Sequence, residues 1–257
     1  MNSINIYFEL NTFIPVHSTF ESPNMVSLRE IQDSLLHILF PHVCNGCGSD
    51  IINEDSMLCM HCISELPETK FHLHAANPVE KIFWGRLPVV NGTAQYYFTK
   101  ESLMQRLMHQ FKYGGNKELG RQLGRLIGND LRETNRFNLL NAIVPLPLFP
   151  AKEKRRGYNQ ATVLCEGIAE ILNIEILKDV IIRIQATETQ TKKGRMERWE
   201  NIKGKFELVR PEKIRDMHLL LVDDVITTGA TLEACGQELL KGANTRLSIA
   251  TLCFASR

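Results

Sequence analysis

The residues with the clearest chemical potential lie at positions 219–231, where the sequence reads LLLVDDVITTGAT. An apolar run typical of a buried strand leads directly into Asp223 and Asp224, and a turn rich in Thr and Gly then leads into a helix. Ligands of open α/β sheets bind just beyond the carboxyl ends of the strands. The order of these elements therefore predicts a ligand site at the turn.

The turn and the two acids suit different parts of one ligand. Backbone N–H groups at a helix N-terminus, together with hydroxyl groups, favour a phosphate. Carboxylates only accept hydrogen bonds, so Asp223 and Asp224 suit sugar hydroxyls instead. The combination predicts a ribose-5-phosphate site, and a plain strand–turn–helix with an acidic cap is the alternative. The residues expected at the phosphate are Thr227, Thr228, Gly229, Ala230 and Thr231.

This segment resembles the signature of type I phosphoribosyltransferases. The resemblance implies that the two acids hold the ribose 2′- and 3′-hydroxyls and that the turn holds the 5′-phosphate. It also implies a doubly wound α/β fold with a mostly parallel sheet.

Two CxxC pairs form a second group of chemically active residues, namely Cys44, Cys47, Cys59 and Cys62. Four thiolates can close a tetrahedral site, which predicts structural Zn²⁺ without metal catalysis. A module this short cannot bury enough core to fold alone, so metal binding would supply much of its folding free energy. Redox-active pairs and two disulfides fit less well, because thioredoxin-type motifs occur singly at a βα turn. We expect the neighbouring His42 and His61 at the surface.

A basic stretch at 149–160, FPAKEKRRGYNQ, follows a strand predicted at 142–144. We interpret it as a loop leading into a helix that begins near Asn159. As a set, Lys154, Arg155 and Arg156 suit a diphosphate, which needs several cationic and N–H donors. A solvated basic loop is the alternative, and it is the interpretation we prefer for Lys152 alone.

Two further segments are candidates for the same pocket. Residues 187–206 are polar and carry Arg195 and Arg198. This segment either closes over a charged substrate or forms a solvated hairpin, and the sequence favours neither. For FKYGGNK at 111–117 we favour simple helix termination over a Lys or Tyr that faces the pocket.

The elements that position these residues alternate between strand and helix. Apolar patterns predict strands at 92–98, 142–144, 180–184, 205–209, 219–222 and 246–254, and helices at 101–111, 118–132, 159–172 and 230–240. This alternation predicts a parallel sheet covered on both faces. Three parts are expected: a disordered extension at 1–26, a helix plus the cysteine module at 27–69, and a phosphoribosyltransferase-like domain at 70–257. A loose linker is expected at 67–78.

Bulk properties narrow the class of protein. The chain has 257 residues, 44% hydrophobic residues and a formal net charge of +1, which excludes a globally basic nucleic-acid binder. We find neither a membrane span nor a signal peptide, and Met25 is an alternative start to Met1. An odd total of 7 cysteines without an export signal indicates reduced thiols in a cytoplasmic protein. Cys165, Cys235 and Cys253 are expected in the core.

The cysteine module, KYGG, VPLPLFPAKEKRRGYNQA, the TQT-to-Phe206 stretch and LLLVDDVITTGAT occur in an order that resembles the ComF family of competence-associated, amidophosphoribosyltransferase-like proteins. The resemblance spans residues 27–257, with Tyr158 where the family usually has Phe. It implies binding of phosphoribosyl diphosphate with Mg²⁺ and a part in DNA uptake or transformation.

Three functional hypotheses remain open at this point. The first is a Mg²⁺-dependent phosphoribosyltransferase with Asp223, Asp224, Arg195 and Arg198 as its catalytic residues. The second is a nucleotide sensor or single-stranded DNA platform, with Tyr158 and Trp199 stacking on bases. The third is a scaffold whose zinc module docks other competence proteins. The acceptor substrate and the oligomeric state have no readable signature.

Overall fold

The computed structural model describes residues 42–184 and 204–255. The predicted extension at 1–26 and the predicted helix after residue 27 lie outside the described residues, as do Arg195, Arg198 and Trp199.

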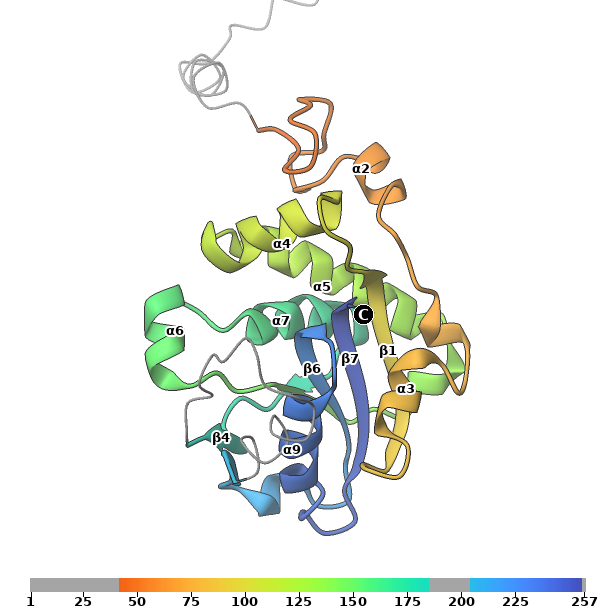
Figure 1. The fold of residues 1–257 in the computed structure, drawn as a ribbon, viewed down its shortest axis with the longest axis vertical. Coiled ribbons are helices and arrows are strands. Elements are labelled where there is room, and N and C mark those ends of the chain that lie inside the picture. The colour runs from red at the N-terminus through yellow and green to blue at the C-terminus, as the bar shows by residue number, and fades with distance from the viewer. Residues whose placement is uncertain (1–41, 185–203, 256–257) are drawn as a thin grey trace, which may run out of the picture. The chain divides into compact units, whose positions relative to one another are not determined.

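A five-stranded, fully parallel sheet forms the centre of the fold (Figure 1). Its spatial order is β1-β7-β6-β2-β3, so the last strand of the chain is inserted between the first strand and β6. The strands are β1 (Val89–Tyr97), β2 (Ala142–Pro145), β3 (Glu175–Ile176), β6 (His218–Ile226) and β7 (Arg246–Phe254).

Helices cover both faces of this sheet, as the near-continuous apolar strands predict. Along β6, Leu220 and Val222 enter one hydrophobic core, while Leu219 and Leu221 enter the other. The first core contains residues of α4 (Leu103–Tyr113), α5 (Lys117–Arg132) and α7 (Gln160–Leu172). The second contains residues of α3 (Pro78–Phe83) and α9 (Ala230–Leu239). The doubly wound α/β prediction is confirmed.

The remaining described elements are short. They are α2 (Met60–Ser64), η1 (Phe71–Leu73), η2 (Asn135–Phe137), α6 (Pro150–Arg156), β4 (Ile181–Arg183), β5 (Phe206–Leu208) and η3 (Pro211–Ile214). β4 and β5 pair antiparallel, so the two strands predicted on either side of residues 187–206 do meet. No described helix combines the length and the apolar character that crossing a bilayer requires.

One prediction about the basic stretch was wrong. We expected a loop before Asn159, but residues Pro150–Arg156 form helix α6. Pro150 sits in the first turn, where its missing N–H costs no hydrogen bond, and Gly157 ends the helix with a φ of 82°. The basic side chains therefore project from a helix and not from a flexible loop.

The segment 67–78, which we expected to be a loose linker, is held against β1. The Tyr97 N–H donates to the Pro67 carbonyl at 2.8 Å, and the Thr69 hydroxyl donates to the Ala94 carbonyl. Asn77 caps α3 and also donates to the carbonyls of Phe71, His74 and Gly92. A short antiparallel bridge between Glu68 and Tyr96 and several side-chain hydrogen bonds thus hold the segment, and hydrophobic patterns detect neither.

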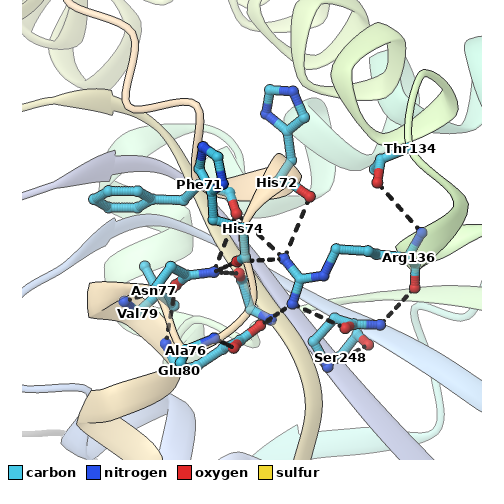
Figure 2. Close-up of polar contacts among 12 residues, drawn as sticks. Phe71, His72, His74, Ala76, Asn77, Val79, Glu80, Thr134, Arg136 and Ser248 are labelled. Atoms are coloured by element: carbon cyan, nitrogen blue, oxygen red, sulfur yellow. Dashed lines mark hydrogen bonds and ion pairs between the residues drawn. The ribbon is translucent and has the colours of Figure 1, made fainter.

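Arg136 completes this attachment (Figure 2). Its Nη1 donates to the His74 carbonyl at 2.7 Å and more weakly to the carbonyls of Phe71 and His72. Its Nη2 pairs with the Glu80 carboxylate and donates to Asn91 Oδ1. Because the side chains of Arg136 and Glu80 are only 18% and 11% exposed, the pair is largely shielded from water.

Replacing Arg136 by Met should destabilise the fold by about 3–5 kcal/mol, because the Glu80 carboxylate would lose its buried partner. Chemical denaturation measures this change. Arg132→Met is the matched control, since Arg132 is exposed and donates only to Asn129 within its own helix. Equal stability of the two variants would contradict a structural role for the network.

Candidate functional site

The two acids of the predicted sugar site lie at the carboxyl end of β6. We expected the strand to end at Val222, but pairing with β7 continues through Asp223–Thr251 to Ile226–Phe254. The acids therefore belong to the strand and inherit its rigid backbone. The Asp224 N–H donates to Asp223 Oδ1 at 2.8 Å, which fixes the first carboxylate.

Asp224 has a cationic partner from a distant part of the chain. Its Oδ2 lies 2.9 Å from Nζ of Lys112, at the end of α4. The two side chains are 15% and 21% exposed, so water screens the pair only partly. The predicted helix termination is confirmed, because α4 ends at Tyr113, but the alternative that we did not favour also holds, since Lys112 delivers an ammonium group to Asp224.

Asp223 has an unusually high proton affinity. Burial, followed by the nearby Asp224 carboxylate, raises the pKa of Asp223 to about 7. The backbone N–H of Asp224 and the ammonium groups of Lys112 and Lys152 act in the opposite direction. A carboxylate that titrates near neutral pH is typical of functional sites.

The turn after β6 combines threonine hydroxyls with an uncapped helix N-terminus. Gly229 is the N-cap of α9, has a φ of 73° and provides no side-chain cap for the first N–H groups of the helix. The Thr227 side chain is exposed, and the Thr228 hydroxyl lies 3.5 Å from the N–H of Ala230. Three threonines and the first N–H groups of α9 therefore lie at the positive end of this helix.

Gly229→Ala should destabilise the fold by about 1–3 kcal/mol, since an L residue is strained in this left-handed conformation. An added Cβ would also lie 2.5 Å from Ile82 Cγ2 and 3.0 Å from Phe83 Cε1. The matched control is Gly85→Ala, because Gly85 has a φ of 69° but no atom near an added Cβ. Thermal denaturation should rank Gly229→Ala clearly below Gly85→Ala, and an equal loss would contradict the close packing of the turn.

The residues predicted to bind diphosphate lie in two different environments. Lys154 and Arg155 are exposed on α6. Arg156 is partly buried, donates from Nη1 to Gln160 Oε1 at 2.8 Å and lies over the ring of Tyr113, 5.6 Å from its centroid. Arg156 is therefore already oriented, whereas its two neighbours on α6 extend into solvent.

Two cations that we did not select also face the acids. Lys152 is exposed as a residue, but the surrounding protein partly desolvates its ammonium group, which lowers its pKa. The positive charges of Arg156 and Arg183 lower this pKa further, whereas the negative charge of Asp224 raises it. Burial also lowers the pKa of Arg183 at the end of β4, and the negative charge of Asp223 opposes this effect. The sequence did not single out Lys152 because it lies within a generally basic segment, and it did not single out Arg183 because that residue belongs to no recognisable motif.

Arg183 also lines a hollow of about 550 Å³ between the loop after β2, α6 and β4. Pro145, Pro147, Ile181 and Ile182 form its apolar wall, and Glu153 and Lys178 add charge. Arg183 thus belongs both to this hollow and to the surroundings of Asp223.

Tyr158 does not serve as a stacking platform. It is 8% exposed, and its hydroxyl donates to the carbonyl of Phe111. The structure therefore contradicts the expectation that Tyr158 stacks on a nucleic-acid base. The buried ring instead joins the start of α7 to the end of α4.

The four cysteines of the two CxxC pairs converge. Their Sγ atoms all lie within 4.8 Å of one another, and Cys47 Sγ and Cys59 Sγ are 3.7 Å apart, too far for a disulfide. The Cys44 sulfur accepts the N–H groups of Gly46 and Cys59 at 3.4 and 3.2 Å. Such bonds favour thiolates, so these residues form a four-cysteine cluster suited to a metal.

The pKa values of the two buried thiols of the cluster, Cys44 and Cys62, shift in opposite directions. Burial raises the pKa of Cys44, but N–H groups from Cys59, Cys47 and Gly46 outweigh it and bring the pKa to about 6. Burial and the neighbouring thiols raise the pKa of Cys62. The other thiols, Cys165, Cys235 and Cys253, are fully buried in the cores, as predicted.

Comparisons with known proteins agree with this architecture. The model of the phosphoribosyl transferase domain family matches residues 159–257. Competence protein F of Haemophilus influenzae is 32% identical over 80% of this chain and 87% of its own length. DNA utilization protein YhgH of Escherichia coli K12 is 31% identical over 82% of this chain and 89% of its own length. Competence protein ComFC of Bacillus subtilis is 28% identical over 60% of this chain and 61% of its own length.

These findings confirm a type I phosphoribosyltransferase fold preceded by a small four-cysteine module. The parallel sheet, the domain match and the cysteine cluster all contribute to this assignment. The similarity to two relatives extends over most of both chains and is not confined to one loop. The chain therefore belongs to the ComF family, which includes Competence protein F, ComFC and YhgH.

Proposed function

We propose that this chain binds phosphoribosyl diphosphate at the carboxyl end of β6. The observation that carries the proposal is the placement of two carboxylates at the end of β6, one short turn before a helix whose N-terminus has no side-chain cap. Asp223 and Asp224 accept hydrogen bonds from the ribose diol, and the turn at Thr227–Thr231 donates to the 5′-phosphate.

The diphosphate lies toward α6 in this proposal. Arg156 is oriented by Gln160, and Lys154 and Arg155 add positive charge from the same helix. Arg195 and Arg198 remain proposed ligands of the diphosphate, on a segment outside the described residues. Mg²⁺ arriving with the ligand would supply further neutralisation of the diphosphate's negative charge.

Phosphoribosyl transfer requires little covalent help from the protein. The bond between the anomeric carbon and diphosphate breaks through an oxocarbenium-like state, so positioning and stabilisation of the leaving group dominate. The cations of α6 would stabilise the departing diphosphate, while the ionised acids hold the sugar. This arrangement supports a phosphoribosyltransferase as the proposed activity.

We further propose that the four-cysteine cluster holds structural Zn²⁺. Four sulfur ligands would leave no open coordination position, so the metal would stabilise the module and take no part in the reaction. We place the boundary between the module and the phosphoribosyltransferase-like domain near residues 69 and 70.

The relatives named for competence and DNA utilization support a role in DNA uptake or natural transformation. In this proposal the protein works in the cytoplasm with reduced cysteines and cooperates with other competence proteins.

Isothermal titration with phosphoribosyl diphosphate and Mg²⁺ tests the proposed binding. We expect saturable heat with the complete ligand and weaker binding of ribose 5-phosphate, which lacks the diphosphate. Absence of heat under all conditions would contradict the proposal. Fluorescence anisotropy with labelled single-stranded DNA across a salt series tests the rival function, since a steep salt dependence indicates phosphate contacts along a strand.

A further inference from the structure

Helix α4 connects the four-cysteine module to the sugar site. Its last turn carries Lys112, whose ammonium pairs with Asp224 at 2.9 Å. Its buried residues belong to the same hydrophobic core as residues of the module, and the described residues from His42 onward fall in one compact unit. A rigid element that is held by the module and carries a contact to the sugar site can transmit the position of one to the other.

The first CxxC knuckle contacts both sides of the turn that follows Lys112. Gln110, two residues before Lys112, donates from Nε2 to the Asn45 carbonyl at 3.0 Å. Asn116, which caps α5 just after the turn, donates from Nδ2 to Asn45 Oδ1 at 3.0 Å. Asn45 follows Cys44 directly, so the backbone of the knuckle fixes the end of α4.

The second half of the module is attached to α5. Gln122 Oε1 accepts the Met57 N–H at 2.6 Å, and its Nε2 donates to Ser56 Oγ at 2.8 Å. Apolar contacts reinforce these bonds, because the module and α4 share one core. Its members include Cys44, Leu58, Cys62, Met104, Leu107 and Phe111.

We propose that Lys112 is a positioning residue for the Asp223–Asp224 pair, and that the four-cysteine module sets its place through α4. The ammonium group counters the charge of Asp224 and so favours ionisation of the neighbouring Asp223, which prepares the pair for a sugar diol. This inference rests on the proposed function of the site, and it extends that function to a residue from another part of the chain.

Several other groups also influence the charge of Asp223. The carboxylate of Asp224 opposes its ionisation, and the ammonium of Lys152 favours it. The guanidinium of Arg183 from β4 and the buried thiol of Cys235 from α9 also act on it. Lys112 differs from Lys152 and Arg183 because it directly contacts the second acid.

Carboxyl ¹³C NMR of the full chain without ligand tests the electrostatic step. In Lys112→Met we expect the pKa of Asp223 to rise by about one unit, since a cation is removed from its surroundings. Lys112→Arg should restore the wild-type value, and Lys100→Met should leave it unchanged because Lys100 is exposed. An unchanged pKa in Lys112→Met overturns the proposal.

Titration with phosphoribosyl diphosphate and Mg²⁺ at several pH values gives the second readout. We expect Lys112→Met to bind the ligand about tenfold more weakly near pH 7 and to regain affinity at higher pH, because its acids ionise only at a higher pH than in wild type. If wild type binds and Lys112→Met binds equally at every pH, the role of Lys112 is refuted. If wild type itself does not bind, the proposed function fails, while the NMR result still decides the electrostatic step.

A double variant tests the contribution of the module. Asn45→Ala with Gln110→Leu removes contacts between knuckle and helix but keeps all four cysteines. With bound zinc verified on the same samples, we expect the pKa of Asp223 to shift upward as in Lys112→Met. Gln105→Leu is the control on the same helix, since its carboxamide accepts only from Glu101. A wild-type pKa in the zinc-loaded double variant contradicts the coupling.

Discussion

Replacing Asp223 and Asp224 together by Asn should weaken binding of phosphoribosyl diphosphate by about 100-fold or more. A hydrogen bond to a charged group contributes about 1.5–3 kcal/mol, so two such acceptors contribute several kcal/mol in total. Asn has nearly the same shape, so the variant removes charge without opening a cavity. Isothermal titration with Mg²⁺ measures the loss.

The matched control for this experiment is Asp216→Asn. Asp216 is exposed just before β6 begins, at the opposite end of the same strand, and accepts from Asn244. This change should leave ligand affinity unaltered. Wild-type affinity in the double variant would show that the ligand, if it binds, does not use the acids.

Stability measurements on Asp223→Asn separate a loss of ligand binding from a loss of fold. The folded-state pKa of Asp223, about 7, exceeds the ordinary aspartate value of 3.8 that applies to the unfolded chain. Between these values the folded state binds more protons than the unfolded state, so stability falls as pH rises through this window. Asp223→Asn should therefore raise the melting temperature relative to wild type near pH 8 and have little effect near pH 4, where Asp223 is largely protonated.

Removing the metal of the four-cysteine cluster is the second change with a large expected effect. Structural zinc sites contribute about 10–16 kcal/mol of apparent binding free energy in isolated fingers. That range reaches or exceeds the usual 5–15 kcal/mol stability of a whole domain. We expect purified protein to contain one zinc per chain, and Cys62→Ala to lose the metal and a large part of the thermal stability.

Elemental analysis and thermal denaturation measure the two effects together. Hydrogen exchange should show lost protection first in the module and α4, because Cys44, Cys62 and Met104 share a core. Cys165→Ala is the control, since Cys165 is buried within α7 outside the cluster. Protein that contains no metal under reducing conditions, and whose melting temperature does not respond to a chelator, would contradict the zinc assignment.

The sequence predicted the parts of the molecule that depend on local pattern. An apolar run followed by Asp223 and Asp224 and a Thr/Gly turn specifies a strand, two acceptors and a helix start within a few residues. The CxxC spacing likewise predicted the cluster, because four thiols placed so closely in sequence have few other structures available. Strands β1, β2, β6 and β7 and helices α4, α5, α7 and α9 were predicted because their hydrophobic periods are clear, whereas the short elements β3 and α3 were not.

Other features were hidden because their determinants lie far apart in the chain. Strand β6 continues through the acids only because β7 pairs with them, and β7 begins 20 residues after Ile226. Segment 67–78 looked like a linker because Arg136 and Asn77 hold it through carbonyl groups, which leave no periodic signal. Helix α6 was not predicted because its run of charged residues leaves no hydrophobic period to detect.

The sequence by itself thus determined which chemical groups the chain brings together locally: two carboxylates, a Thr/Gly turn at a helix start and a four-cysteine cluster. Only the tertiary structure decided their neighbours. Lys112 meets Asp224 because α4 ends beside β6, and α4 is held there by a knuckle that begins at Cys44. The physical reason is that local chemistry fixes the conformation of a short segment, whereas the field at a carboxylate depends on every charge that packing brings near it.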